Sequence, residues 1–260
     1  MPYGGDSMSV LNVIFVLWLR DMKRFVRAPS RIIGNITLPF FMLVALGAGF
    51  GRMPIPGMQS PNYLSFLVPG MVGMTILFSG VFSGMSVLWD RQYGFLKEIM
   101  VAPVPRVAIV IGRIASGSTT GVIQATVIAL FATALGFVLP SPVKFALAVV
   151  FMVLISIIFT GIGLIFASRM KDEQGFGLIM NFLVLPFLFL SGAFAPISNL
   201  PAWVRAISCI DPLTYGIEGL RAVLLGSSAI ALPVSFAVCA ACAVLLILTG
   251  AWFFETSEAV

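Results

Sequence analysis

Six apolar runs constrain this chain more than any other feature of its sequence. They lie at about residues 32–50, 64–88, 107–139, 144–168, 176–194 and 230–254. A helix needs about 20 apolar residues to cross the hydrocarbon of a bilayer, and each run is near that length or longer. Because the runs are continuous and do not alternate with polar residues, they predict helices and not the strands of a barrel. We therefore expect an all-α integral membrane protein whose residues 1–260 form one transmembrane domain.

The composition agrees with this interpretation. Of the 260 residues, 60% are hydrophobic and 10% are charged, whereas a soluble domain is about 45–50% apolar and about 25% charged. The net charge of +5 does not indicate a nucleic-acid partner, because the basic residues are not gathered on one soluble surface. Cys239 and Cys242 lie in an apolar run of a chain without histidine, and a zinc site normally needs four ligands, so we predict no metal site.

The basic residues indicate which way the six runs point. Eleven Lys and Arg fall on one side of the runs and four on the other, the four being Arg52, Lys144, Arg205 and Arg221. Basic loops stay in the cytoplasm, so the N-terminal segment, the second-to-third connector and the fourth-to-fifth connector are expected there, together with both termini.

Residues 8–28, before the first run, predict an amphipathic helix at the cytoplasmic interface. Arg20, Lys23, Arg24 and Arg27 recur at the spacing of one helical stripe. Such a basic face suits lipid head groups or a protein partner. An equally simple interpretation is an anchor that only sets the orientation of the first span.

Two short helices are predicted on the outer side, between the fifth and sixth runs. Pro201 suits a first helical position, and Asp211 suits the N-cap of a helix that begins at Pro212. Glu218 and Arg221, three residues apart, can form an ion pair on one face. Both helices have mostly apolar faces, so we expect them to lie on the outer leaflet or dip into it.

Five residues within the runs are candidates for a translocation path. They are Asn35, Gln124, Asn181, Phe182 and Phe189. Hydrogen bonding between helices is the commoner fate of such amides, and packing or lipid contact is the commoner fate of phenylalanine. The chain holds 23 Phe but four Trp and four Tyr, which slightly favours an apolar or amphiphilic cargo over a sugar.

Glycines four residues apart predict close helix crossings. Such pairs occur at residues 47 and 51, 80 and 84, and 117 and 121. Each pair alone is weak evidence, but their recurrence favours tight packing within the chain or at a dimer seam.

Missing residues narrow the function. The apolar cores hold no Asp, Glu or Lys, which disfavours an ion-coupled secondary carrier. Without histidine, a membrane enzyme with a Ser-His-Asp or Cys-His arrangement is excluded. No Gly-Lys pair occurs, so the chain has no phosphate-binding loop of the ATPase kind. A stand-alone channel or carrier therefore remains as the alternative to a permease that another polypeptide powers.

One connector is unusually charged for so apolar a chain. Residues 89–106 carry Asp90, Arg91, Lys97, Glu98 and Arg106. A permease that is driven by a separate subunit needs a charged cytoplasmic surface of this kind for docking.

Two blocks carry a resemblance to a known family. The first, DRQYGFLKEIMVAPVPR followed by VAIVIGRI, closely resembles the second-to-third connector of type-2 ATP-binding-cassette exporter permeases. The second, LSGAFAPISNLPAWVR followed by DPLTYGIEGLR, resembles the outer segment of the same family. The resemblance extends over nearly the whole chain and is nearest to the drug-resistance and nodulation-factor branch.

The resemblance implies the partners and the activity. A homo- or heterodimer of permeases would dock two separate ATPase subunits, which bind the ATP and Mg, in the inner membrane of a bacterium or archaeon. The expected cargo is an amphiphile such as a drug, lipid or glycolipid, exported by alternating access through a path flanked by the first, second and fifth spans. A polysaccharide-exporting permease is the alternative within the family.

The resemblance also implies docking residues. A coupling helix is expected at about residues 92–101, and its docking candidates are Arg91, Gln92, Tyr93, Gly94, Phe95, Leu96, Lys97 and Glu98. A second cytoplasmic contact is expected from Arg20, Arg24, Arg169, Lys171, Asp172 and Glu173. The alternative for both connectors is a solvated turn between spans.

Overall fold

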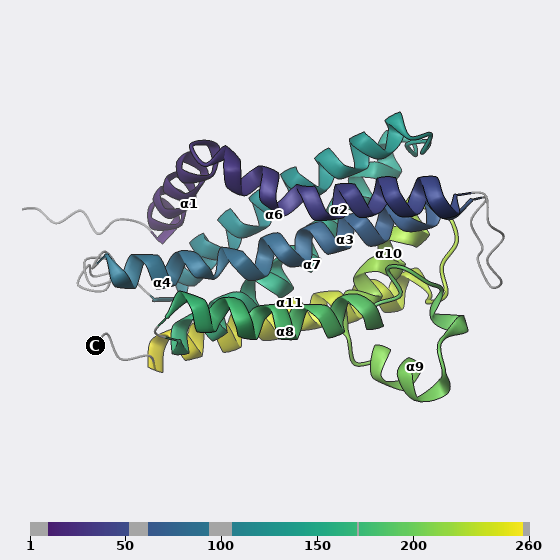
Figure 1. Ribbon diagram of the computed structural model, residues 1–260. Coiled ribbons are helices and arrows are strands. Elements are labelled where there is room, and N and C mark those ends of the chain that lie inside the picture. The colour runs from purple at the N-terminus through teal and green to yellow at the C-terminus, as the bar shows by residue number, and fades with distance from the viewer. Residues whose placement is uncertain (1–9, 52–61, 94–105, 171, 257–260) are drawn as a thin grey trace, which may run out of the picture.

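The computed structural model describes residues 10–51, 62–93, 106–170 and 172–256 (Figure 1). Within these ranges the chain forms helices and no strand. The helices are α1 (Val10–Val26), α2 (Pro29–Phe50), α3 (Tyr63–Ser83), α4 (Met85–Gln92), α6 (Arg106–Ala134), α7 (Pro142–Arg169), α8 (Glu173–Leu190), the 3-10 turn η1 (Ile197–Asn199), α9 (Ala202–Ser208), α10 (Pro212–Leu225) and α11 (Leu232–Thr256).

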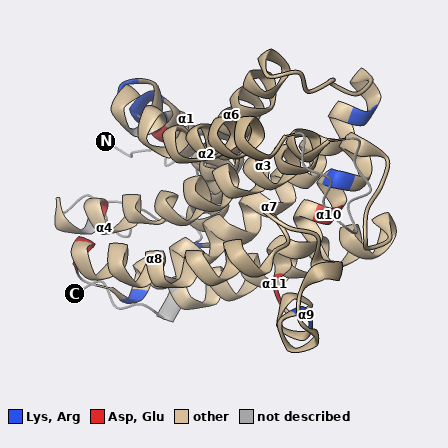
Figure 2. Cartoon of the chain, turned by 45° about the vertical axis from the view of Figure 1, so that its right-hand side comes forward, with Lys and Arg blue, Asp and Glu red and all other residues tan. Residues whose placement is uncertain are grey.

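Six segments are long and apolar enough to cross a membrane. They are Ile32–Phe50, Tyr63–Asp90, Arg106–Ala134, Pro142–Arg169, Glu173–Leu190 and Leu232–Phe253. Most charged residues lie near the two ends of the bundle, and the long middle stretches of the helices are almost free of them (Figure 2). These features confirm the prediction of an all-helical membrane protein with six spans. α1 and the end of α11 lie at the same end of the bundle (Figure 1).

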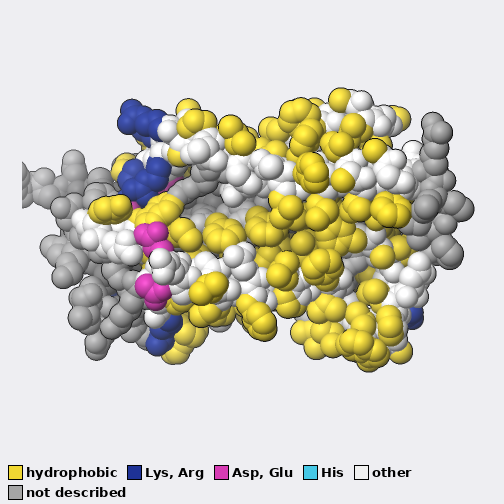
Figure 3. Space-filling view, in the orientation of Figure 1, with side chains coloured by type: hydrophobic (Ala, Val, Ile, Leu, Met, Phe, Trp, Pro, Cys, Tyr) yellow, Lys and Arg dark blue, Asp and Glu magenta, His cyan; other side chains and the backbone are white. Residues whose placement is uncertain are grey.

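The span built from α3 and α4 lies at the centre of the bundle. In an 18-residue stretch of this span 94% of the residues are buried, whereas in the corresponding stretches of α2, α8 and α11 11%, 22% and 17% are buried. α3 contacts α2, α6, α7, α8 and α10. A helix that is apolar all round is expected to be surrounded in this way. The outer helices leave wide apolar surfaces uncovered, and one of them is visible across the middle of Figure 3.

Glycines bring α3, α6 and α7 into close contact. A Cβ on Gly84 would overlap the backbone of Gly163 in α7, and a Cβ on Gly163 would overlap the carbonyl of Val81. On α6, a Cβ on Gly117 would meet the side chain of Thr160. The glycine pairs of the second and third runs therefore both pack against α7 within one chain.

Two helix ends differ from the expected bounds. The second run divides at Gly84 into α3 and α4. The third run was expected to reach residue 139, but α6 ends at Ala134 and the chain turns at Gly136, which has a φ of 101°. The apolar residues beyond Ala134 therefore form part of a turn and not of the helix, because glycine is the residue that takes positive φ at little cost.

α10 is a core helix and does not lie on the surface of the bundle. It contacts α3, α7 and α11, and most of its residues, including Leu213, Ile217 and Leu220, are fully buried. Gly216 and Gly219 give the room for this packing, since Ile155 and Phe151 of α7 contact them. By contrast, α9 exposes Trp203 at 69% and Ile207 at 44%.

Candidate functional site

A buried ionic cluster joins α1, α4 and α6. The Asp90 side chain is 2% exposed and accepts hydrogen bonds from Arg20 at 2.9 Å, from Arg24 at 3.5 Å and from Arg113. The Asp21 carboxylate lies 2.9 Å from the guanidinium of Arg20 and 3.6 Å from that of Arg113. Charges can be buried at tolerable cost only when they are paired in this manner.

The cluster fixes the N-terminal helix on the body of the bundle. Asp21 also accepts a hydrogen bond from Ser116 of α6 at 3.1 Å. About one turn away, the Trp18 indole donates to Thr119 of the same helix at 3.0 Å. α1 is therefore held at two levels along α6 as well as by Asp90 of α4.

Two residues of the basic stripe of α1 also form ion pairs within the chain. Arg20 and Arg24 contact Asp90, while Lys23, Arg24 and Arg27 are exposed. Arg20 and Arg24 were predicted as part of a cytoplasmic contact with a partner, and the structure shows them in ion pairs within the chain. Their contact with a partner stays a prediction.

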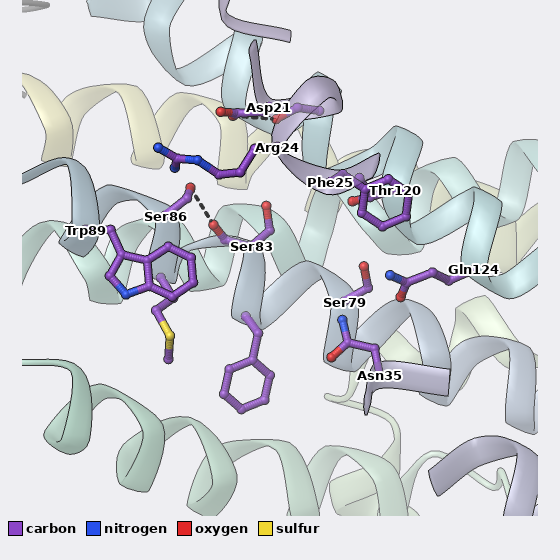
Figure 4. Close-up of a pocket in the computed structure, with 13 residues that line it drawn as sticks. Asp21, Arg24, Phe25, Asn35, Ser79, Ser83, Ser86, Trp89, Thr120 and Gln124 are labelled. Atoms are coloured by element: carbon purple, nitrogen blue, oxygen red, sulfur yellow. Dashed lines mark hydrogen bonds between the residues drawn. The ribbon is translucent and has the colours of Figure 1, made fainter. Parts of the chain in front are cut away.

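A pocket of about 260 Å³ lies beside this cluster. It is bounded by α1, α2, α3, α4 and α6, and Figure 4 shows its lining. Its residues are Asp21, Arg24, Phe25, Asn35, Ser79, Phe82, Ser83, Met85, Ser86, Trp89, Ser116, Thr120 and Gln124. The structure thus brings together two of the predicted path residues, Asn35 and Gln124, from helices that are distant in sequence.

The amide of Gln124 is the least satisfied polar group of the pocket. The residue is 1% exposed, and neither its side-chain oxygen nor its nitrogen has a hydrogen-bond partner among the described residues. In Figure 4 it points toward Ser79 and Asn35. A buried polar group without a partner costs roughly 1–3 kcal/mol, so this amide is placed where a further group can bind.

The other three path candidates lie elsewhere. Asn181, Phe182 and Phe189 are exposed on α8, with Phe182 at 81% and Phe189 at 65%. They do not line the pocket of Gln124. The five candidates therefore form two groups, one inside the chain and one on the outer face of a sparsely packed helix.

α4 leads directly into the charged connector. Gln92 and Tyr93 are exposed, Tyr93 at 82%. The Arg91 side chain and the residues Gly94, Phe95, Leu96, Lys97 and Glu98 lie outside the described part of the chain. The coupling helix therefore stays a prediction.

The fourth-to-fifth connector lies at the same end of the bundle. Asp172 caps α8 by accepting a hydrogen bond from the backbone N–H of Gly175. The Arg169 guanidinium lies 4.9 Å from the ring centre of Phe253 in α11. Glu173 is half-buried in the first turn of α8, where an acidic side chain stabilises the helix. Lys171 lies outside the described residues, and a partner contact here stays a prediction.

A second buried ion pair is found in α10. The predicted pair forms: Arg221 donates to Glu218, and its guanidinium also donates to the Gly192 carbonyl at 3.1 Å. The same guanidinium lies 3.9 Å from the ring centre of Phe66, and Glu218 accepts from the backbone N–H of Ala229 at 2.6 Å. The pair thus fastens α3 and the segments on either side of α10 to one another.

Asp211 is the N-cap of α10, as its sequence predicts. Its carboxylate accepts from the Leu213 N–H at 2.8 Å and from the Thr214 hydroxyl at 3.3 Å. Burial raises the pKa of Asp211 to about 7, although these hydrogen bonds act in the opposite direction. The protonation of this cap therefore changes near neutral pH.

No cluster of His, Cys, Asp and Glu that could hold a metal ion occurs among the residues that the structure describes. Cys239 and Cys242 both occur as free thiols.

Comparisons with known proteins place these features in a family. The family model described as "ABC-2 type transporter" matches residues 12–225, which include most of α1, both ion clusters and the pocket. The chain is 32% identical to a putative transport permease, ycf38, of Cyanophora paradoxa over 218 residues, which are 83% of this chain and 75% of the relative.

Two bacterial relatives show similar coverage. Nodulation protein J of Rhizobium leguminosarum bv. viciae is 27% identical over 87% of this chain and 85% of its own length. The inner membrane transport permease YadH of Escherichia coli (strain K12) is 27% identical over 85% of this chain and 86% of its own length.

Proposed function

This chain belongs to the ABC-2 type transporter family, and we propose on that premise that it is the permease subunit of an ATP-driven exporter. Its relatives include proteins named as transport permeases. These 260 residues contain no Gly-Lys pair and so hold no phosphate-binding loop of the ATPase kind. The proposal therefore includes separate ATPase subunits that bind ATP and Mg and dock on this chain.

One observation carries the proposal: the most buried span continues through α4 into the charged connector. In an 18-residue stretch of this span 94% of the residues are buried, and α4 is fixed at Asp90 to both α1 and α6. A displacement of the connector by an ATPase would therefore reach three helices directly. Arg91, Gln92, Tyr93, Gly94, Phe95, Leu96, Lys97 and Glu98 are the proposed docking residues.

The cargo that we propose is an amphiphile, such as a drug, lipid or glycolipid, moved by alternating access. The described spans expose large apolar side chains on α2 and α8, including Phe41 at 66% and Phe182 at 81%. Such surfaces suit contact with lipid and with a second permease copy. Pairing of two copies through these faces would place the translocation path between them.

The proposed location is the inner membrane of a bacterium or archaeon, with both termini in the cytoplasm. The relative YadH is named an inner membrane permease. The excess of Lys and Arg near α1, α4 and α8 supports this orientation.

The test reverses the two central charges of the connector. In the complex with its ATPase, reconstituted in vesicles, the double variant Lys97→Glu with Glu98→Lys should hydrolyse ATP but lose export of an amphiphilic dye. Membrane insertion and dimer formation should not change. The matched control is Lys144→Glu, an exposed reversal at the start of α7 and at the other end of the bundle. Normal export by the double variant would contradict the docking proposal.

A further inference from the structure

We infer that the pocket between α1, α2, α3, α4 and α6 binds the uncharged head group of an amphiphile, one that bears hydroxyl or amide groups. The inference rests on the proposed export function only in treating this amphiphile as cargo, and it names the chemical class of that cargo. Four observations carry it.

The first is the state of Gln124. Its side chain is 1% exposed, and both amide atoms lack a partner among the described residues. An amide carries an acceptor on oxygen and two donors on nitrogen. A hydroxyl or amide of a ligand can donate to the oxygen and accept from the nitrogen, and so satisfy both atoms at once.

The second is the character of the lining around that amide. Asn35 of α2, Ser79 of α3 and Thr120 of α6 line the same pocket, and in Figure 4 Asn35 and Ser79 lie close to Gln124. These groups both donate and accept hydrogen bonds, and none is charged. A charged head group would lose its hydration here without gaining a counter-charge.

The third is the pairing of the charges at the other end of the pocket. Arg24 is 3.5 Å from Asp90, and Asp21 is held by Arg20 at 2.9 Å and by Ser116 at 3.1 Å. The lining itself holds one acidic and one basic residue. Because Arg24 already has Asp90 as a counter-ion and Asp21 repels an anion, this end of the pocket favours a phosphate less than an unpaired arginine would.

The fourth observation is the small volume of the pocket and the apolar residues around it. Sites for drug-sized ligands are about 300–1,000 Å³, so a pocket of about 260 Å³ holds a head group and not a whole amphiphile. Phe25, Phe82 and Trp89 give it apolar faces. Asn35 belongs to α2, whose Ile33 and Leu38 are 64% and 44% exposed, so a tail that leaves past Asn35 meets an apolar helix.

The test measures binding of two probes with the same tail to the full chain in lipid nanodiscs. Decyl glucoside has an uncharged hydroxyl head, and decyl phosphate has an anionic one. Both are titrated below their micelle concentrations, with empty nanodiscs subtracted. Saturable binding of decyl glucoside is expected, with a Kd at least about tenfold lower than that of decyl phosphate.

Gln124→Leu should weaken binding of decyl glucoside by about tenfold or more, because the hydrogen bonds to the head are lost. The matched control is Gln174→Leu, which makes the same change at an exposed position of α8 and should bind as the wild type does. A second readout is the melting temperature: decyl glucoside should raise it for the wild type and for Gln174→Leu, but not for Gln124→Leu.

Gln124→Leu is expected to fold, since it removes a buried group that has no partner. If it does not fold, the pair Ser79→Ala and Thr120→Val tests the same lining and should show the same loss. Equal binding by the wild type and a folded pocket variant would overturn the inference, as would stronger binding of decyl phosphate. Neither binding measurement uses ATP. The head-group inference can therefore be contradicted while the connector reversal still abolishes export, and the docking proposal can be contradicted while the probe still binds.

Discussion

The cluster around Asp90 gives the sharpest prediction about stability. Asp90→Asn removes the charge that three arginines share, while it keeps the size of the side chain. The Asp90 and Arg113 side chains are each 2% exposed, whereas that of Arg24 is 41% exposed. Removing one partner of a buried ion pair costs about 3–5 kcal/mol, but an exposed pair contributes about 0–1 kcal/mol.

We therefore expect Asp90→Asn to lower the free energy of unfolding by about 3 kcal/mol or more. Arg24→Gln should lower it by less than about 1 kcal/mol. The double variant Asp90→Asn with Arg113→Met should cost less than the sum of the two single changes, because neither charge of that pair is then left alone. We expect a coupling free energy of roughly 2–3 kcal/mol.

The assay is reversible unfolding in mixed micelles, followed by circular dichroism. Tryptic cleavage within α1 gives a second readout, since loss of Asp90 should release that helix before the bundle unfolds. The reasoning would be refuted if Asp90→Asn cost no more than Arg24→Gln. It would also be refuted if the effects at positions 90 and 113 were simply additive.

Two further predictions concern packing and pH. Gly163→Val should destabilise the bundle by about 1–3 kcal/mol because its side chain would overlap the carbonyl of Val81. A Cβ on Gly34 would meet nothing within 4 Å. Gly34→Ala should therefore leave the free energy of unfolding unchanged or raise it by up to about 1 kcal/mol in the same assay. Between pH 4 and pH 7, native Asp211 keeps a proton that the unfolded chain releases, so stability should fall as the pH rises through this window. The slope should be at most about 1.4 kcal/mol per pH unit, and Asp211→Asn should remove it; an unchanged slope in that variant would contradict the assignment.

The features that the sequence predicted well are local. Six long apolar runs specify six helices with no need for tertiary information, since each helix satisfies its own backbone hydrogen bonds. The Asp211 cap and the Glu218–Arg221 pair also depend on spacings of two or three residues, and both form. Such contacts can be recognised from one segment alone.

The features that the sequence did not predict require contacts between distant segments. Asp90 pairs with Arg20, which is 70 residues away, and with Arg113, which is 23 residues away. A charge at the end of an apolar run looks the same in sequence whether it faces water or a second buried charge. The signal that was available is the position of Arg113 seven residues inside α6, which is too deep for an unpaired arginine.

The pocket and the burial of α10 were missed for a related reason. The sequence shows that Gln124 is a polar residue within a span, but its lack of partners depends on the positions of α2 and α3 beside it. The burial of α10 depends on Gly216 and Gly219, which admit side chains of α7. Small residues on an amphipathic helix are the clue that could have distinguished a core helix from a surface one.

The contacts of Asp90 also restrict how this chain can diverge. A substitution that removes its charge leaves the Arg113 side chain, which is 2% exposed, with Asp21 at 3.6 Å as its remaining counter-ion. Sequences that lose the acid at position 90 should therefore also replace the base at position 113. Among homologous permeases, the two positions are expected to vary as a pair, either both charged or both neutral.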